Sequence, residues 1–138
     1  MKRSRRKAVE ATIGAAADAR GSGVAYARVA SAAERHLLRV PFRLDGGDQR
    51  ERATGYAALT AVARVLRARG VARVRFLVDD ETLLGDLSGS SSVPDALVMP
   101  YVRLRCALNQ FDDATFGPAK AGDLVQRARA EVALRVAA

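Results

Sequence analysis

The segment 36–44 alternates apolar and polar residues, and this alternation constrains the fold more than any other feature of the sequence. Leu38, Val40 and Phe42 occupy every second position. Because successive side chains of a β-strand point to opposite faces of its sheet, the pattern predicts a strand with one buried face. Pro41 lies within the run and has no backbone N–H to donate, so we expect this strand at the edge of the sheet.

The rest of the chain predicts a mixture of strands and helices in one domain. Further strands are expected at 8–17, 24–31, 71–78 and 112–117, and helices at 50–69, 79–87, 100–111 and 122–136. The predicted order is β-β-β-α-β-α-α-β-α, which indicates a single α/β domain over residues 8–138. Residues 1–7 carry five positive charges and no apolar anchor, and we expect them to form a disordered basic arm.

The scarcity of cysteine and histidine excludes several classes of site. Cys106 is the one cysteine and His36 the one histidine, so intramolecular disulfides, Cys/His zinc sites and catalytic triads without His36 are ruled out. We expect Cys106 to be a small core or boundary residue and His36 to be a solvated surface residue. At 138 residues and 49% hydrophobic content, the chain can bury a core without disulfides or a structural metal.

The charge of the chain favours a polyanionic partner. There are 23 Lys and Arg residues against 15 Asp and Glu, a net charge of +8. Nucleic acid is the default polyanion for a basic soluble domain, although GC-rich coding would give the same excess of Arg without a binding role. No stretch approaches 18 uncharged apolar residues, so we expect a cytoplasmic protein without membrane contact.

Four local motifs occur in an order that resembles the ribonuclease H family. The family's Asp-Gly-Ala or Asp-Gly-Ser of strand one corresponds to Ile13-Gly14-Ala15, and its Ala-Glu-Tyr-x-Ala-Leu helix start to Gly55-Tyr56-Ala57-Ala58-Leu59. Its Asp-Ser pair after strand four corresponds to Asp79-Asp80, and its Pro-x-x-x-Asn-x-x-Ala-Asp-x-Leu motif is echoed by residues 118–124. The resemblance implies a ribonuclease H-like five-stranded mixed sheet in the order 3-2-1-4-5, with helices on both faces.

The resemblance also implies a catalytic carboxylate set that is degenerate here. Family members hold paired Mg²⁺ ions with carboxylates at these four motifs. Carried over by position, Asp79 and Asp123 are retained, whereas Ile13 and Gly55 replace the other two carboxylates. The remaining pair is expected to hold Mg²⁺ or Mn²⁺ weakly, if at all. A structural role competes with this one, because N-capping explains an Asp at 79 or 80 and the helix dipole explains Asp123.

Together, the resemblance and the charge predict a domain that binds nucleic acid and has lost efficient nuclease activity. The expected partner is a duplex or an RNA/DNA hybrid, since few aromatic residues are left for stacking on single strands. Affinity would come from phosphate contacts, which need no metal. The candidate contacts are Arg3, Arg5, Arg6, Arg50, Arg52, Arg103, Arg105, Lys120, Arg127 and Arg129.

Two other functions remain open from the sequence. One is an active, divalent-metal-dependent ribonuclease with a shifted carboxylate set. It would use Asp79 and Asp123 with one or two of Glu10, Asp18, Asp80 and Asp113. The other is a protein-interaction module or homo-oligomer, in which the edge strand around Pro41 or the Ala-rich helices pair with another chain.

Overall fold

A five-stranded mixed sheet forms the centre of the molecule. The computed structural model describes residues 7–46 and 49–137. The strands are β1 (Lys7–Ala17), β2 (Ser22–Ala30), β3 (Arg35–Arg43), β4 (Val71–Val78) and β5 (Asp113–Pro118). Their order in the sheet is β3-β2-β1-β4-β5, which confirms the predicted topology. The predicted basic arm lies outside the described residues, apart from Lys7, where β1 begins.

In the part of the chain that the structure describes, four α-helices and a short 3-10 helix accompany the sheet. They are α1 (Arg50–Ala68), α2 (Glu81–Ser88), η1 (Asp95–Leu97), α3 (Val98–Leu108) and α4 (Gly122–Ala137). Each helix lies where the sequence predicts one, but α3 begins two residues before Pro100 rather than at it. A proline is tolerated there because the N–H groups of a first helical turn have no partner within the helix.

Strand β1 lies between an antiparallel and a parallel neighbour. Ile13 is opposite Ala27 of β2 on one side and opposite Val78 of β4 on the other. Among the described strands, β3 pairs only with β2, with Pro41 opposite Val24, so the strand that contains the proline is at the sheet edge as predicted. The parallel pairing of β1 and β4 brings the carboxyl ends of both strands to the same end of the sheet.

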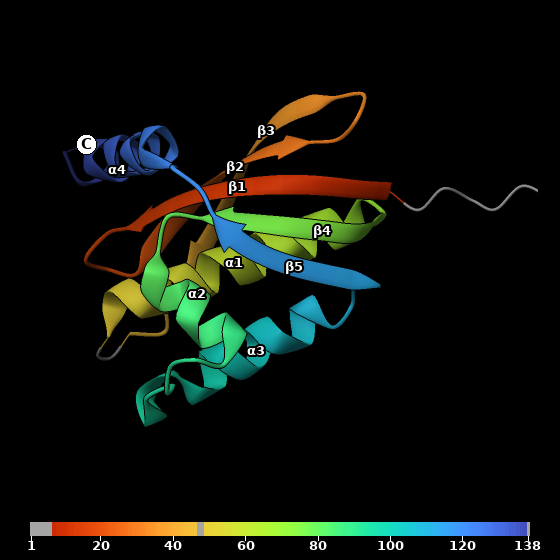
Figure 1. The fold of residues 1–138 in the computed structure, drawn as a ribbon. Coiled ribbons are helices and arrows are strands. Elements are labelled where there is room, and N and C mark those ends of the chain that lie inside the picture. Colours follow the sequence, from red (N-terminus) through yellow and green to blue (C-terminus); the bar gives the residue numbers. More distant parts are fainter. Residues whose placement is uncertain (1–6, 47–48, 138) are drawn as a thin grey trace, which may run out of the picture.

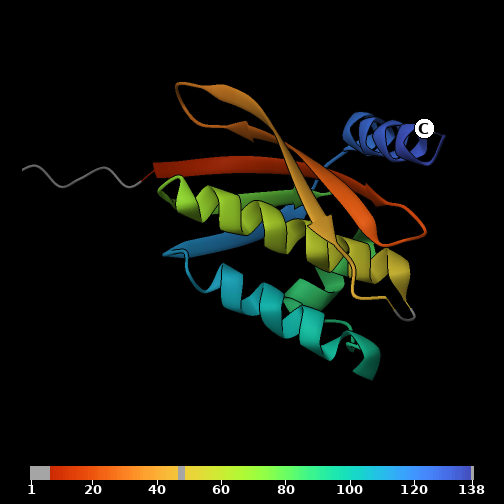
Figure 2. The same ribbon diagram turned by 180° about the vertical axis from the view of Figure 1, so that it is seen from behind.

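Helices cover both faces of the sheet (Figures 1 and 2). Figure 2 shows α1 crossing in front of the strands, and Figure 1 shows α4 apart from the other helices. Val9, Ala11 and Ile13 of β1 belong to the larger core, which also includes residues of α1, α2 and α3. The other face of β1 meets α4, where a Cβ added to Gly14 would lie 2.6 Å from the backbone nitrogen of Val125. Only glycine allows this helix to pack so closely on β1.

His36 and Cys106 both lie on the surface of the molecule. His36 is exposed and hydrogen-bonded to Glu34, as expected for a surface residue. The expectation for Cys106 is wrong, because its side chain is exposed on α3. That helix buries Leu104 and Leu108 instead and turns Cys106 away from the core. Within residues 7–46 and 49–137, none of the helices has the length and apolar content to cross a bilayer.

Candidate functional site

A cleft of about 900 Å³ opens at the carboxyl ends of β1 and β4. The last five residues of β1, 13–17, line it, and four of them are Gly or Ala. The first turn of α2 and the amino-terminal parts of α1 and α4, over residues 50–59 and 122–132, provide the surrounding walls. In open α/β sheets, ligands bind outside the carboxyl ends of the parallel strands, so this cleft is the candidate functional site.

Acidic side chains lie on the α1 and α2 sides of the cleft. They belong to Glu51, Asp79, Asp80 and Glu81. Asp80 is the N-cap of α2, and its Oδ1 accepts a hydrogen bond from the backbone N–H of Leu83 at 3.0 Å. The carboxylate of Asp79 is exposed, and no hydrogen bond or ion pair joins it to another described residue. The N-capping role therefore belongs to Asp80, which leaves Asp79 available to a ligand.

The two positions where the resemblance implies carboxylates have no oxygen ligand to offer. Ile13 has a hydrocarbon side chain, and Gly55 has no side chain. Ile13 is 7% exposed and packs in the core shared with α1. Gly55 faces α2, where an added Cβ would lie 3.4 Å from Leu83 Cδ2 and 3.7 Å from Asp80 Oδ2. These are ordinary contact distances, so the backbone around Gly55 has room for a side chain that the sequence does not provide.

The structure does not bring Asp79 and Asp123 together in the cleft. Asp123 is outside the cleft lining, and its Oδ2 accepts a hydrogen bond from Arg28 Nη1 of β2 at 2.8 Å. This hydrogen bond lowers the pKa of Asp123 below its usual value. The side chain thus points from α4 toward Arg28 of β2, and Asp79 lines the cleft without it.

Of the four alternative carboxylates, only Asp80 lines the cleft. Glu10 is three residues before Ile13 on the strand, which places it on the opposite face of the sheet. Asp113 is opposite Arg73, near the start of β4 and away from the cleft. Asp18 closes the β1–β2 turn, where its Oδ1 accepts from the backbone N–H groups of Arg20 and Ser22.

This arrangement does not fit the paired-metal site of the ribonuclease H family. Among residues 7–46 and 49–137, no three His, Cys, Asp or Glu side chains gather in a group able to hold a metal ion. Mg²⁺ needs several hard oxygen ligands in near-octahedral geometry. Ile13 and Gly55 supply none, and Asp123 is engaged by Arg28. The residues present therefore do not provide the ligands that catalysis by paired metal ions requires.

Two of the predicted phosphate-binding residues line the cleft from opposite sides. Arg50 stands at the start of α1, and Arg129 lies on α4. One nitrogen of Arg50 donates to the backbone oxygen of Asp18, and no hydrogen bond joins Arg129 to the described residues. The two guanidinium groups therefore border the small residues at the end of β1 with most of their donors unused.

The other predicted contacts lie elsewhere. Arg103 and Arg105 are on α3, which takes no part in the cleft lining, and Lys120 is exposed just before α4. The guanidinium of Arg127 lies over the ring of Tyr26, 5.0 Å from its centroid. The predicted contacts of the arm, Arg3, Arg5 and Arg6, fall outside the described residues.

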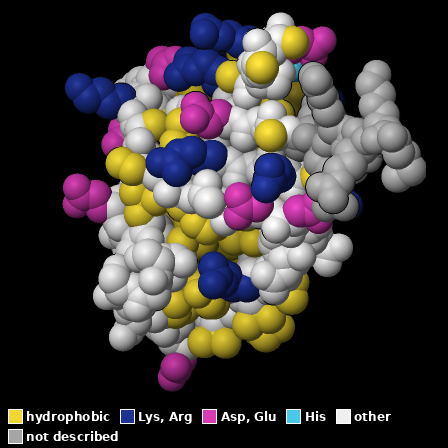
Figure 3. Space-filling model, turned by 45° about the vertical axis from the view of Figure 1, so that its right-hand side comes forward, with side chains coloured by type: hydrophobic (Ala, Val, Ile, Leu, Met, Phe, Trp, Pro, Cys, Tyr) yellow, Lys and Arg dark blue, Asp and Glu magenta, His cyan; other side chains and the backbone are white. Residues whose placement is uncertain are grey.

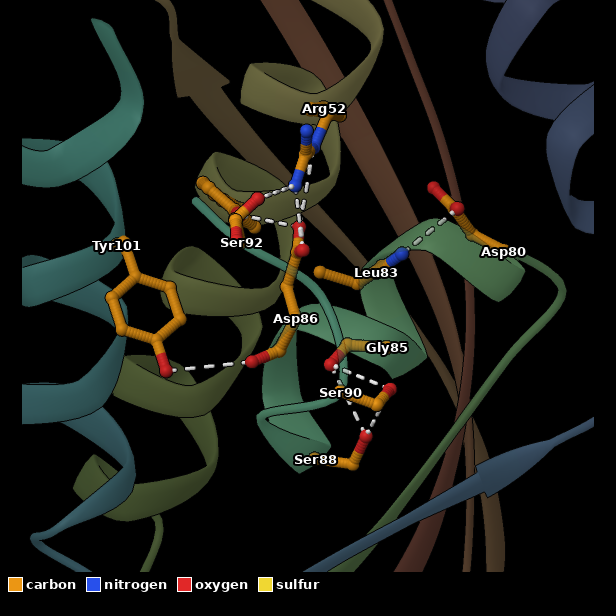
Figure 4. A network of polar contacts seen from close by, with 10 residues as sticks. Arg52, Asp80, Leu83, Gly85, Asp86, Ser88, Ser90, Ser92 and Tyr101 are labelled. Carbon is orange, nitrogen blue, oxygen red and sulfur yellow. Dashed lines mark hydrogen bonds and ion pairs between the residues drawn. The ribbon is translucent and has the colours of Figure 1, made fainter. Parts of the chain in front are cut away.

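Arg52 is largely buried and forms an ion pair within the protein, so it is not available to a phosphate. Its Nε and Nη2 donate to the two carboxylate oxygens of Asp86 at 3.2 and 2.6 Å, and the Asp86 side chain is fully buried. Tyr56 OH also donates to Asp86, and burial raises the pKa of Tyr56 above its usual value. Tyr101 OH reaches the backbone oxygen of Asp86, so one buried carboxylate residue links α1, α2 and α3 (Figure 4).

Glu51, Glu81 and Asp86 were missed as relevant residues by the sequence analysis. Glu51 precedes Gly55 by four residues, which places both on the same face of α1. That spacing was a usable signal, because a carboxylate one turn away can approach the same site. No comparable local signal exists for Asp86, whose partner Arg52 is 34 residues away.

Comparison with solved structures identifies the architecture. Ribonuclease H1 of Halobacterium salinarum NRC-1 matches with a TM-score of 0.69 and 19% identity, over 89% of this chain and 92% of that one. An N-terminal ribonuclease H domain of Mycobacterium tuberculosis, solved as a fusion with maltose-binding protein, matches with a TM-score of 0.68 and 17% identity. That match covers 88% of this chain and 95% of that one. The chain has the ribonuclease H fold.

A third ribonuclease H structure is of a complex. LC11 ribonuclease H1, solved with an RNA/DNA hybrid, matches with a TM-score of 0.62 and 10% identity, over 88% of this chain and 91% of that one. Neither a protein-family model nor a curated protein sequence matches the chain. At these identities the likeness to ribonuclease H concerns the fold, and the activity has to be argued from the cleft itself.

Proposed function

We propose that this ribonuclease H-like domain binds a nucleic-acid backbone in the cleft without cleaving it efficiently. The observation that carries the proposal is the composition of the cleft. Arg50 and Arg129 stand on opposite sides of it, whereas Ile13 and Gly55 occupy the positions where metal-binding carboxylates are expected. Binding and cleavage have different requirements, because phosphate contacts need cations whereas hydrolysis needs a complete metal site.

The shape and charge of the cleft support a phosphodiester ligand. Residues 15–17 are half-buried alanines, and their small side chains allow a bulky backbone to approach the end of β1. Arg50 and Arg129 offer N–H donors suited to phosphate oxygens, and the net charge of +8 attracts a polyanion over longer distances. The complex of LC11 ribonuclease H1 makes an RNA/DNA hybrid the first probe to test.

Salt-dependent binding to a hybrid duplex tests the proposal. We expect Arg50→Ala and Arg129→Ala each to weaken binding and to reduce the slope of log affinity against log salt by about one. Arg69→Ala is the matched control, because it removes the same charge at the opposite end of α1. Equal effects of all three substitutions would show that affinity follows overall charge rather than the cleft.

A second candidate function, a metal-dependent ribonuclease, rests on the four acidic side chains of the cleft. Glu51, Asp79, Asp80 and Glu81 line the cleft but do not gather into a metal-binding group in this structure, so they would have to move together to hold an ion. Incubating the hybrid with the protein and Mg²⁺ or Mn²⁺ separates the two functions. We expect hydrolysis near background. Robust cleavage by the unmodified chain that is lost in Asp79→Asn would favour the enzymatic function over the binding function.

A further inference from the structure

Helix α3 carries apolar residues on its outer side as well as on its inner side. Leu104 and Leu108 point into the core and are buried. On the outer side, Val98, Met99 and Val102 are 43, 59 and 44% exposed. Leu37 and Leu134 are the other exposed large hydrophobic residues in the described part of the chain, and each lies on a different element. An amphipathic surface helix would place polar residues on its outer side.

The exposed apolar residues of α3 form one continuous stripe. Val98, Val102 and Cys106 are spaced by four residues, and Met99 lies beside the first two, so all four share one side of the helix. We call these four residues the outer stripe. At 1.5 Å per residue, it runs for about 12 Å along the helix. Figure 3 shows hydrophobic side chains gathered over the lower half of the molecule, at the height of α3 in Figure 1.

Arginines border the outer stripe on both sides. At 100° per residue, Arg103 and Arg105 fall on opposite margins of the stripe. Arg103 is half exposed and paired with the exposed Asp45 at 2.6 Å, and Arg105 lies over the ring of Tyr101, 5.8 Å from its centroid. Arg105 makes no ion pair with a described carboxylate and therefore adds positive charge beside the apolar surface, whereas Arg103 would exchange Asp45 for a carboxylate of the partner.

The surface continues beyond Arg103 into a hollow. This hollow of about 410 Å³ lies between β3, α1 and the start of α3, and Ala57, Ala61 and Pro100 are among its lining residues. Arg103 lines it too, so the hollow and the outer stripe share a border. A partner bound to the outer stripe could therefore place a side chain in the hollow. It would then bury more surface than the outer stripe of α3 offers alone.

We infer that the outer stripe binds an acidic amphipathic helix of a partner protein. Such a helix would bury its apolar side chains on Val98, Met99, Val102 and Cys106, and its carboxylates would face Arg103 and Arg105. A second copy of this chain fits less well. Pairing two stripes about a two-fold axis near Val102 brings Arg103 close to its own counterpart and joins two chains of net charge +8.

The partner site is separate from the cleft that is proposed to bind nucleic acid. None of the four stripe residues lines that cleft. Substitutions in the stripe should therefore leave the binding of an RNA/DNA hybrid unchanged, and substitutions of Arg50 or Arg129 should leave the binding of a helical peptide unchanged. Failure of one proposal can thus be recognised without failure of the other.

The test uses two synthetic helical peptides and the full chain labelled with ¹⁵N. Both peptides repeat leucine at positions i, i+4 and i+8. One has Glu on both sides of the leucine stripe, and the other has Lys. We expect the Glu peptide to shift the amide resonances of α3 and of the hollow, with at least tenfold weaker binding for Val102→Asp. The matched control is Leu134→Asp, which places the same charge at an apolar position that is 72% exposed on α4.

Reversal of the charges provides the stronger test. Changing Arg103 and Arg105 together to Glu should transfer the preference from the Glu peptide to the Lys peptide. Three outcomes would overturn the inference. They are equal binding of both peptides by the unmodified chain, no resonance shifts on α3 at millimolar peptide, and self-association of the chain that Val102→Asp removes. The last result would assign the stripe to a second copy.

Discussion

Arg52 holds both carboxylate oxygens of the fully buried Asp86, and this ion pair fixes α2 against α1 behind the cleft. Removing one partner of a buried ion pair leaves an uncompensated charge, which costs about 3–5 kcal/mol. We expect Arg52→Ala to lower the free energy of unfolding by that amount, measured by urea denaturation. Arg103→Ala breaks the exposed pair with Asp45 and should cost about 0–1 kcal/mol. Similar losses for both variants would contradict a structural role of Arg52.

Gly55 should be replaceable by alanine with a gain in stability. The added Cβ would meet Leu83 Cδ2 at 3.4 Å and Asp80 Oδ2 at 3.7 Å, which are ordinary contacts. Because glycine inside a helix is less favourable than alanine by about 1 kcal/mol, Gly55→Ala should raise the melting temperature. Gly14→Ala should lower it, since its Cβ would lie 2.6 Å from Val125 N. Scanning calorimetry of the two variants shows whether each melting temperature rises or falls as expected.

Adding the two carboxylates that the resemblance implies should create a cation site. Ile13→Asp and Gly55→Glu together place two new carboxylates in a cleft that Asp79 already lines. We expect Mg²⁺ to raise the melting temperature of the double variant and not that of the unmodified chain. Ile13 is 7% exposed, so Ile13→Asp alone should destabilise the protein by several kcal/mol. A Mg²⁺ effect that survives Asp79→Asn would show that the new site forms elsewhere.

Glu131 should make the stability of the protein sensitive to acid. Arg39 Nε donates to its carboxylate at 2.8 Å, and hydrogen bonds from Tyr26 and Arg135 also reach it. The hydrogen bonds, that of Arg39 foremost, lower the pKa of Glu131 to about 2 from its usual 4.5. Because the unfolded chain then takes up the proton first, the stabilisation is complete above about pH 4.5 and is lost as the pH falls toward 2.

The variant Glu131→Gln tests this dependence. Its free energy of unfolding should fall less between pH 5 and pH 2.5 than that of the unmodified chain, because the titrating group is gone. Glu10→Gln serves as the control, since Glu10 is exposed on β1 and makes none of the contacts of Glu131. Parallel stability curves for Glu131→Gln and the unmodified chain would show that another group governs the acid sensitivity.

The strands were predictable because their signals are local, whereas their order in the sheet was implied by the resemblance to ribonuclease H. The run at 71–78 is mostly apolar and lies between Gly70 and Asp79, and β4 has these bounds. Pro41 within an alternating run indicated the edge of the sheet without any knowledge of its neighbours. The start of α3 was less certain, since a proline can occupy any position of the first helical turn.

The details of the site depend on contacts that a sequence does not display. Cys106 was misplaced because α3 is apolar around most of its circumference, so that residue type alone does not tell which side is buried. The direction of Asp123 depends on Arg28, which lies 95 residues earlier on another strand. Likewise, Asp86 meets Arg52 only because α2 packs on α1. Long-range packing thus decides which charged side chains remain available to a ligand.

The direction of β1 limits how the basic residues near the start of the sequence could cooperate with the cleft. The strand begins at Lys7, and the cleft is lined only from Ile13 onward, so the two lie about 20 Å apart at 3.3 Å per residue. Four extended residues span at most about 14 Å of backbone, which is shorter than this distance. We therefore expect Arg3, Arg5 and Arg6 to touch phosphates at the rim of the cleft or beyond it. Their contribution should appear only with duplexes long enough to span both regions, which makes the minimum length of the duplex a measure of the footprint.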